Sequence, residues 1–116
     1  MGLNRLEVNV NREGYWASDS EPHLPNPMPV SWAGKVSFLR LLATVEGKAR
    51  ETNYKGSSPC RLCDQRNGST EYTYTRTGNT WVWPSGLSHY IRDHQVRPSL
   101  AFEEFITNAA QRKVIT

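Results

Sequence analysis

Four side chains in this sequence combine donor types and spacings that suit a metal ion: Cys60, Cys63, His89 and His94. They read Cys-x2-Cys, an interval of 25 residues, and His-x4-His, and they include both cysteines and two of the three histidines of the chain. Zinc prefers four sulfur or nitrogen ligands in a tetrahedron, and ligand pairs two to five residues apart can reach one ion. The pattern therefore predicts a structural Zn²⁺ bound by these four residues.

Other interpretations of the same residues stay open at this point. Cys60 and Cys63 could form a small buried pair with unrelated histidines, whereas a disulfide across so short a loop would add little stability. His23 lies in the rigid run Pro22-His23-Leu24-Pro25 and could replace one of the later histidines. A zinc-bound imidazole also needs a partner for its second nitrogen. The candidate carboxylates for that role are Asp93, Glu71 and Asp64.

The donor set argues against catalysis. A catalytic zinc keeps one position open for water, whereas two cysteines and two histidines close the site. A nucleobase deaminase would need His-x-Glu ahead of Pro-Cys-x2-Cys, and only the second half of that signature is present, at Pro59–Cys63. The ββα-metal nucleases place a catalytic histidine ahead of the hairpin, which this chain does not. We expect a protein that is not an enzyme.

The N-terminal half predicts a strand, an irregular arm and a helix. Leu6, Val8 and Val10 alternate with polar residues, as in a half-buried strand. Four prolines within residues 22–29 exclude regular structure, so residues 11–30 are expected to form a Pro-rich arm that packs on the core. Ser31 is a suitable N-cap for a helix to about Glu46. The expected apolar stripe of that helix consists of Trp32, Val36, Leu39, Leu42 and Ala43.

The C-terminal half predicts the elements that position the four metal ligands. Residues 48–55 form a strand that leads into a turn at 56–59, and residues 71–76 and 80–83 form a hairpin around Gly78-Asn79. Ser85 caps a short helix that carries both histidines and ends at His94, because ligands five apart on an ideal helix diverge by about 140°. Ser99 caps a last helix to about Val114. Its expected buried side consists of Leu100, Phe105, Ile106, Ala109 and Ala110.

These elements predict an α+β fold: a small zinc-stabilised domain in which a β-hairpin and a helix, arranged as in a Cys2His2 finger, pack with an N-terminal strand, a middle helix and a C-terminal helix. The hydrophobic fraction of 37% is low for a self-sufficient core in 116 residues, which fits stabilisation by a metal. We expect one domain over residues 1–116. Within it lie the Pro-rich arm (11–30), a zinc-binding module (56–98) and the C-terminal helix (99–114).

The order of knuckle, hairpin and helix with paired histidines resembles a Cys2His2 zinc finger, although the usual interval between the pairs is nearer a dozen residues. Several phrases also resemble a group of short bacterial proteins without an established activity. They are Gly14-Tyr15-Trp16, Glu21-Pro22-His23-Leu24-Pro25, Cys60-Arg-x-Cys63, Asn67-Gly68-Ser69-Thr70, Trp83-Pro84-x-Gly86-Leu87-x-His89-Tyr90 and Val96-Arg97-Pro98. This resemblance implies one compact fold in a cytosolic bacterial or phage setting. An immunity or anti-defence role would fit a small bacterial protein, but no residue of the sequence selects it.

Composition narrows the location. No run approaches the roughly 20 apolar residues of a membrane span, and the opening residues lack the pattern of a signal peptide. We therefore expect a cytoplasmic protein that does not contact a membrane. The oligomeric state stays open.

Two kinds of partner remain. Aromatic residues such as Trp81 and Trp83 anchor protein interfaces, which favours a protein partner. Alternatively, arginines in or near the metal module could contact the phosphates of a nucleic acid. Against this, the net charge is only +3 and its basic residues are scattered. The predicted partner contacts are Arg61, Arg66, Arg76, Arg92, Trp81 and Trp83, with Arg97 nearby.

Overall fold

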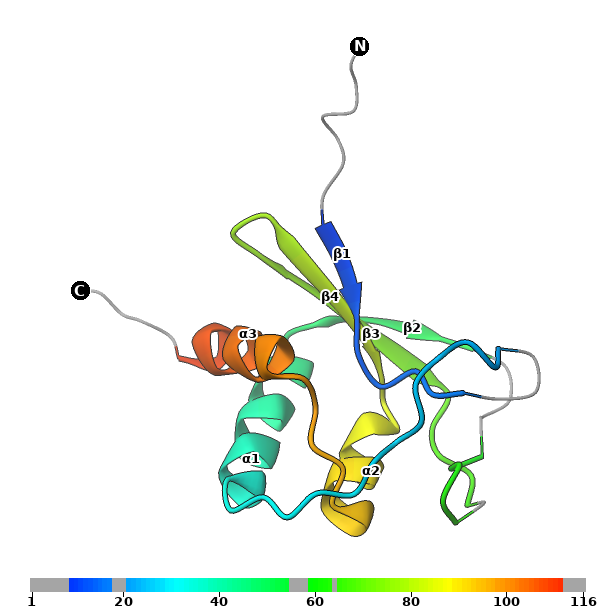
Figure 1. Ribbon diagram of the computed structural model, residues 1–116. Helices are drawn as coiled ribbons and strands as arrows, with labels where there is room; N and C mark the ends of the chain where they lie inside the picture. Colours follow the sequence, from blue (N-terminus) through cyan, green and yellow to red (C-terminus); the bar gives the residue numbers. More distant parts are fainter. Residues whose placement is uncertain (1–8, 18–20, 55–58, 64, 112–116) are drawn as a thin grey trace.

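The computed structural model describes residues 9–17, 21–54, 59–63 and 65–111. Within these ranges the chain forms a four-stranded sheet and three helices in the order β1-α1-β2-β3-β4-α2-α3 (Figure 1). The strands are β1 (Asn9–Arg12), β2 (Arg50–Asn53), β3 (Thr70–Arg76) and β4 (Asn79–Pro84). The helices are α1 (Lys35–Glu46), α2 (Leu87–His94) and α3 (Leu100–Ala110). The chain therefore has the predicted α+β class.

The sheet is mixed and has the strand order β1-β4-β3-β2. β3 and β4 form the predicted hairpin, and Arg76 pairs with Asn79. The two-residue loop is thus Thr77-Gly78, one position earlier than predicted, and both residues have positive φ (49° and 84°), as a type I′ turn requires. β1 pairs in parallel with β4, so Asn11 and Arg12, which were predicted to open the irregular arm, instead belong to a strand that is anchored to the hairpin.

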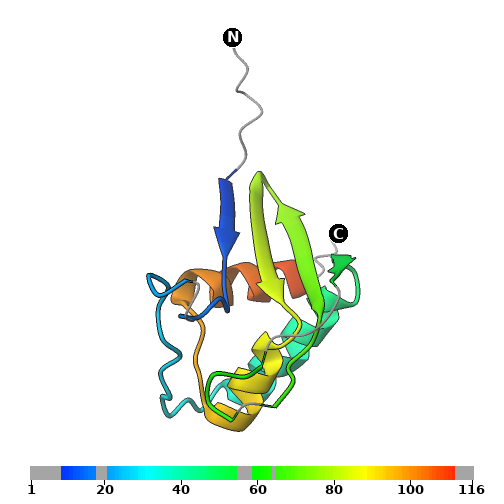
Figure 2. The ribbon, with the colours of Figure 1, turned by 90° about the vertical axis from the view of Figure 1, so that its right-hand side faces the viewer.

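The three helices lie on one side of the sheet, and no helix of the described residues covers its other face (Figures 1 and 2). Trp81 and Trp83 of β4 point into the layer between sheet and helices and contact Phe102 of α3 at ring-centroid distances of 5.2 and 5.3 Å. Trp83 is fully buried, and Trp81 is only 8% exposed. The aromatic face of the hairpin is therefore covered by α3. The prediction that Trp81 and Trp83 contact a partner is wrong for this conformation.

The start and the buried face of α1 differ from the prediction. The helix begins at Lys35, its N-cap is Gly34 without a side-chain cap, and Ser31 lies outside it. Trp32 precedes the helix because its ring packs on Phe38, at 5.4 Å, and lies under the Arg97 guanidinium. The buried residues are Phe38, Leu42 and Val45, whereas the predicted Val36 and Ala43 are exposed.

The two later helices match the prediction in position but not in every detail. Ser99 caps α3, since its hydroxyl accepts the Phe102 amide. The buried positions are 102, 105, 106 and 109; Leu100 is 71% exposed because it lies about 200° around the helix from Phe102. The helix ends at Ala110 rather than near Val114. α2 begins after Gly86 instead of Ser85, because the Ser85 hydroxyl faces the Thr70 amide at 3.4 Å.

Of the remaining predicted elements, some are present in the structure and others lie outside the described residues. The strand expected at 48–55 is present as β2, and the arm is irregular from residue 21 to 30 apart from a bridge between Pro29 and Val96. Leu6, Val8 and the turn residues 56–58 lie outside the described residues. Among the helices of the described ranges, none is long and apolar enough to cross a membrane.

Candidate metal centre

The structure brings Cys60, Cys63, His89 and His94 together from two segments that lie a β-hairpin apart in the sequence. One ligand atom from each residue can be chosen so that all four lie within 4.8 Å of one another. Cys63 Sγ and His89 Nε2 are 3.4 Å apart, and the two imidazole ring centroids are 4.9 Å apart. These four residues could therefore hold one metal ion.

A knuckle, defined here as Cys60–Cys63, presents the two sulfurs. The Cys60 amide donates to Gln65 O at 2.8 Å, which closes the loop, and the Leu62 amide donates to Cys60 Sγ at 3.3 Å. This N–H···S hydrogen bond fixes the position of the Cys60 side chain. Cys60 is fully buried, whereas Cys63 is exposed.

Helix α2 presents the two imidazoles, and the second of them, His94, is its last residue. The helix stops at His94, and Gln95 follows in the left-handed conformation with a φ of 57°. The Val96 amide then donates to Tyr90 O at 3.1 Å, so the chain turns back over the last turn. The predicted helix end at His94 is confirmed, and the ligand atoms of both imidazoles lie within 4.8 Å of the two sulfurs.

The two histidines differ in their hydrogen bonds: one ring nitrogen of His89 has a carboxylate partner, whereas one ring nitrogen of His94 is buried without a partner among the described residues. His89 Nδ1 lies 2.9 Å from Asp93 Oδ2, which leaves Nε2 for the cluster. Hydrogen bonding to Arg92 lowers the pKa of Asp93, and His89 adds to this effect, so the carboxylate is charged and can orient the ring. His94 Nε2 is buried without a hydrogen-bond partner among the described residues. A buried nitrogen without a partner is costly unless a further ligand, such as a metal ion, is bound to it.

Asp93 therefore supplies the predicted support for a ligand, and the other two candidates do not. Glu71 instead accepts hydrogen bonds from the hydroxyls of Tyr15 and Tyr54, and it is not a member of the cluster. Asp64 lies outside the described residues. His23 is exposed on the arm and is not a member of the cluster, so the two helical histidines complete it.

Tyr90 joins the knuckle to α2, a role that the sequence analysis missed. Its hydroxyl accepts the Arg61 amide at 2.7 Å, and its buried ring contacts the Trp16 ring edge-on at 5.6 Å. Burial raises the pKa of Tyr90, so the hydroxyl stays protonated. The position next to His89 gave no sign of this contact, because the partner is a backbone amide 29 residues away.

Asn67 and Gly86 bring the segment after the knuckle against the start of α2. The Asn67 side chain donates to Gly86 O at 3.2 Å, and a Cβ on Gly86 would collide with Asn67. Gly68 has a φ of +87°, which favours glycine. In the sequence, the approach of these two segments is indicated by the glycines in Asn67-Gly68 and Ser85-Gly86.

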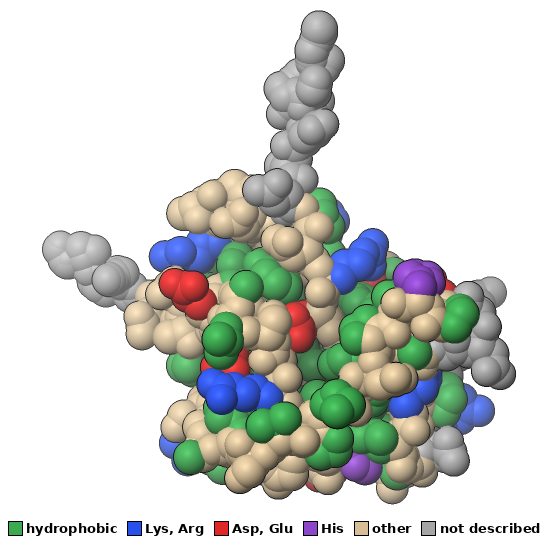
Figure 3. All heavy atoms as spheres, in the orientation of Figure 1, with side chains coloured by type: hydrophobic (Ala, Val, Ile, Leu, Met, Phe, Trp, Pro, Cys, Tyr) green, Lys and Arg blue, Asp and Glu red, His purple; other side chains and the backbone are tan. Residues whose placement is uncertain are grey.

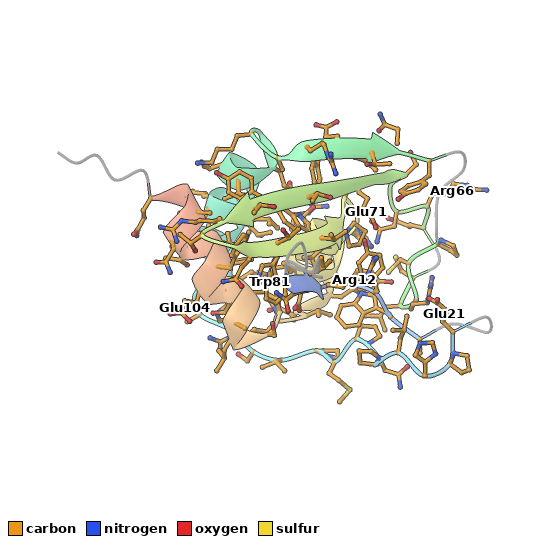
Figure 4. All side chains as sticks on the ribbon, turned by 90° about the horizontal axis from the view of Figure 1, so that it is seen from above. Arg12, Glu21, Arg66, Glu71, Trp81 and Glu104 are labelled. Carbon is orange, nitrogen blue, oxygen red and sulfur yellow. The ribbon has the colours of Figure 1, made fainter. Side chains whose placement is uncertain are left out.

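The predicted arginine contacts are spread over the molecule. Arg61 lies in the knuckle, and its guanidinium donates to Ala17 O and Pro59 O. Arg92 pairs with Asp93 on α2. Arg66 forms a backbone bridge with Pro59, and Figure 4 shows its side chain at the edge of the molecule. Arg76 lines an open depression of about 410 Å³ between the hairpin tip and α3, far from the metal cluster.

Comparison with known proteins does not assign the chain to a family: no protein-family model, no curated protein and no solved structure matches it.

Proposed function

We propose that this chain is a non-enzymatic binding module that a structural Zn²⁺ stabilises and that acts on a protein partner. The cluster of Cys60, Cys63, His89 and His94 carries the proposal, since all four donor atoms lie within 4.8 Å. Zinc bonds of about 2.3 Å to sulfur and 2.0–2.1 Å to nitrogen separate tetrahedral ligand atoms by about 3.3–3.8 Å. The Cys63–His89 distance of 3.4 Å already lies in this range.

The chemistry of the donor set supports zinc over other ions. Two thiolates and two imidazoles suit zinc, whereas calcium and magnesium prefer oxygen ligands. When bound, the ion would supply a cross-link between the knuckle and the end of α2. Four protein donors leave no position for a substrate, which supports a structural rather than a catalytic ion.

The positions of the arginines support a protein partner over a nucleic acid. Arg61 and Arg92 are engaged with groups of the same chain, and Figure 3 shows small groups of basic and acidic side chains interspersed on the face it presents. A DNA-binding zinc finger inserts the start of its helix in the major groove. In this chain the corresponding end of α2 is packed against Asn67. The structure thus offers no specific observation that favours the nucleic-acid alternative.

The metal is tested with His94→Ala and with His23→Ala as its matched control. The purified chain should carry one zinc per molecule by elemental analysis, and His94→Ala should lose it. Because binding and folding are linked at structural zinc sites, His94→Ala should also lower the melting temperature, whereas His23→Ala should change neither property. Wild-type protein without a bound transition metal, with both sulfurs freely alkylated under native conditions, would refute the proposal.

The partner class is tested by electrophoresis of the zinc-loaded chain with a mixed oligonucleotide at low salt. Binding through phosphate contacts would weaken steeply with salt. The proposal predicts no retardation. Salt-sensitive retardation that Arg92→Ala weakens would favour the nucleic-acid alternative instead.

A further inference from the structure

A pocket of about 270 Å³ lies between the Pro-rich arm and the metal module. The arm contributes one wall and the metal module, including the start of α2, contributes the other. The lining residues that matter most are Trp16, Glu21 and Leu24 from the arm, and Pro59, Arg61 and Tyr90 from the module. Figure 4 shows Glu21 on the arm, at the opposite end of the molecule from Glu104 of α3.

We propose that this pocket is the site where the protein partner docks, and that it takes an aromatic side chain from an uncharged segment of the partner. The inference rests on the proposed function, because half of the pocket belongs to the module that the metal holds together. It adds the location of the partner site and the chemistry of the group that enters it.

The size of the pocket limits its occupant. Pockets for drug-sized molecules enclose about 300–1,000 Å³, and this one encloses about 270 Å³. A single large side chain fits that volume better than a nucleotide or an organic cofactor. The pocket is also open to solvent, so the rest of a peptide can continue along the surface.

The walls favour an aromatic ring. Trp16 and Tyr90 already contact each other edge-on, with centroids 5.6 Å apart, and aromatic rings add favourably to such pairs in edge-on or offset positions. Leu24 and Pro59 add apolar surface.

The charges of the lining residues argue against a polyanion. Glu21 and Arg61 are both exposed and carry opposite charges, so a phosphate chain that approaches Arg61 also approaches a carboxylate. An uncharged peptide segment meets no such repulsion. Arg61 can in addition stack on an aromatic ring through its planar guanidinium.

The pocket is coupled to the metal site through two of its walls. Arg61 lies between the two cysteines of the knuckle, and Tyr90 directly follows His89. Their contact, from the Arg61 amide to the Tyr90 hydroxyl, is a hydrogen bond between the knuckle and α2. Removal of the metal should separate these two walls and abolish binding in the pocket.

Nuclear magnetic resonance of the zinc-loaded full chain tests the proposal, with N-acetyl-tryptophan amide as the probe. The expected result is saturable shifts of the Trp16 indole and Asn67 side-chain amide signals. N-acetyl-leucine amide should bind about fivefold more weakly because it lacks the ring. Adenosine monophosphate should not shift these signals, and free tryptophan should bind no more tightly than the blocked amide.

Variants locate the binding. Arg61→Ala should weaken probe binding about fivefold through the lost stacking, whereas Arg40→Ala, which removes an exposed arginine from α1, should have no effect. Leu24→Ala, which leaves the metal module intact, should weaken binding about threefold by removing apolar contact. If Arg61→Ala lowers the melting temperature, its weaker binding could reflect a loss of folded protein. Leu24→Ala then tests the pocket instead.

The outcomes separate the two proposals. Zinc-loaded, folded protein whose pocket signals do not shift would overturn the docking site and leave the structural metal standing. Tighter binding of adenosine monophosphate or of free tryptophan would also overturn it, in favour of a nucleotide or amino-acid site. Probe binding that survives complete chelation would refute the coupling to the metal. Absence of any bound metal in the native protein would overturn both proposals.

Discussion

Glu46 at the end of α1 should make the stability of this protein depend on pH. Its carboxylate accepts a hydrogen bond from Trp83 Nε1 at 2.9 Å, and it lies at the edge of the core. Burial raises the pKa of Glu46 from 4.5 to about 7, and the charge of Glu51 on β2 adds to this rise, whereas the Trp83 hydrogen bond opposes it. The folded chain therefore binds this proton more tightly than the unfolded chain.

The sign follows from that difference. Between pH 4.5 and about 7 the folded state holds a proton that the unfolded state has lost, so the free energy of unfolding falls as the pH rises. The step from 4.5 to about 7 corresponds to at most about 3 kcal/mol. Since the side chain is not fully buried, solvent screening reduces this to about 1–2 kcal/mol.

Glu46→Gln removes the titration and keeps an oxygen that can accept from Trp83. We expect the variant to be more stable than the wild type at pH 8, by about 1–2 kcal/mol or about 5–10 °C in melting temperature. The advantage should shrink as the pH falls from about 7 toward 4.5. Urea denaturation of both zinc-loaded proteins from pH 5 to 8 measures it.

The difference between variant and wild type isolates Glu46, because the metal ligands titrate equally in both proteins. Glu104→Gln on the exposed side of α3 is the matched control and should show no such trend. A free-energy difference between Glu46→Gln and the wild type that stays constant from pH 5 to pH 8 would refute the reasoning.

Three further substitutions, and Leu100→Ala as a control, test the site and the core. Asp93→Asn should weaken zinc affinity about 10- to 100-fold, measured by competition with a chelator, because a ligating histidine loses its charged support. Tyr90→Phe should lower the free energy of unfolding by about 1–3 kcal/mol in urea titrations, since the Arg61 amide loses its acceptor; an unchanged value would contradict the role given to this hydroxyl. Leu42→Ala, at a fully buried position, should cost about 2–5 kcal/mol, whereas Leu100→Ala at an exposed position should change stability by less than about 0.5 kcal/mol.

Much of the fold and the site could be predicted because local signals were strong. The hairpin followed from alternating aromatic and threonine residues around a glycine turn, and the cap at Ser99 from its position before an apolar helix. The four-residue cluster followed from donor types and spacing, since few other reasons place paired cysteines and paired histidines in so short a chain. These features depend on residues close together in the sequence.

Other features could not be predicted, because they depend on contacts between distant segments. Trp32 looked like part of a helical stripe, yet Phe38 and Arg97 hold its ring outside the helix. Ser85 had the chemistry of a cap, but Thr70 across the hairpin occupies its hydroxyl. In both cases the local preference was weaker than a tertiary contact that the sequence does not reveal.

The sequence by itself determined which atoms could bind a metal and which segments carry them, because donor chemistry and spacing are local properties. Only the tertiary structure decided the rest. It assigned Asp93 as the support of His89, placed Trp81 and Trp83 in the core, and formed a pocket between the arm and Tyr90. The physical reason is that burial and hydrogen-bond pairing are set by segments far apart in the chain, which meet only when the sheet and helices pack.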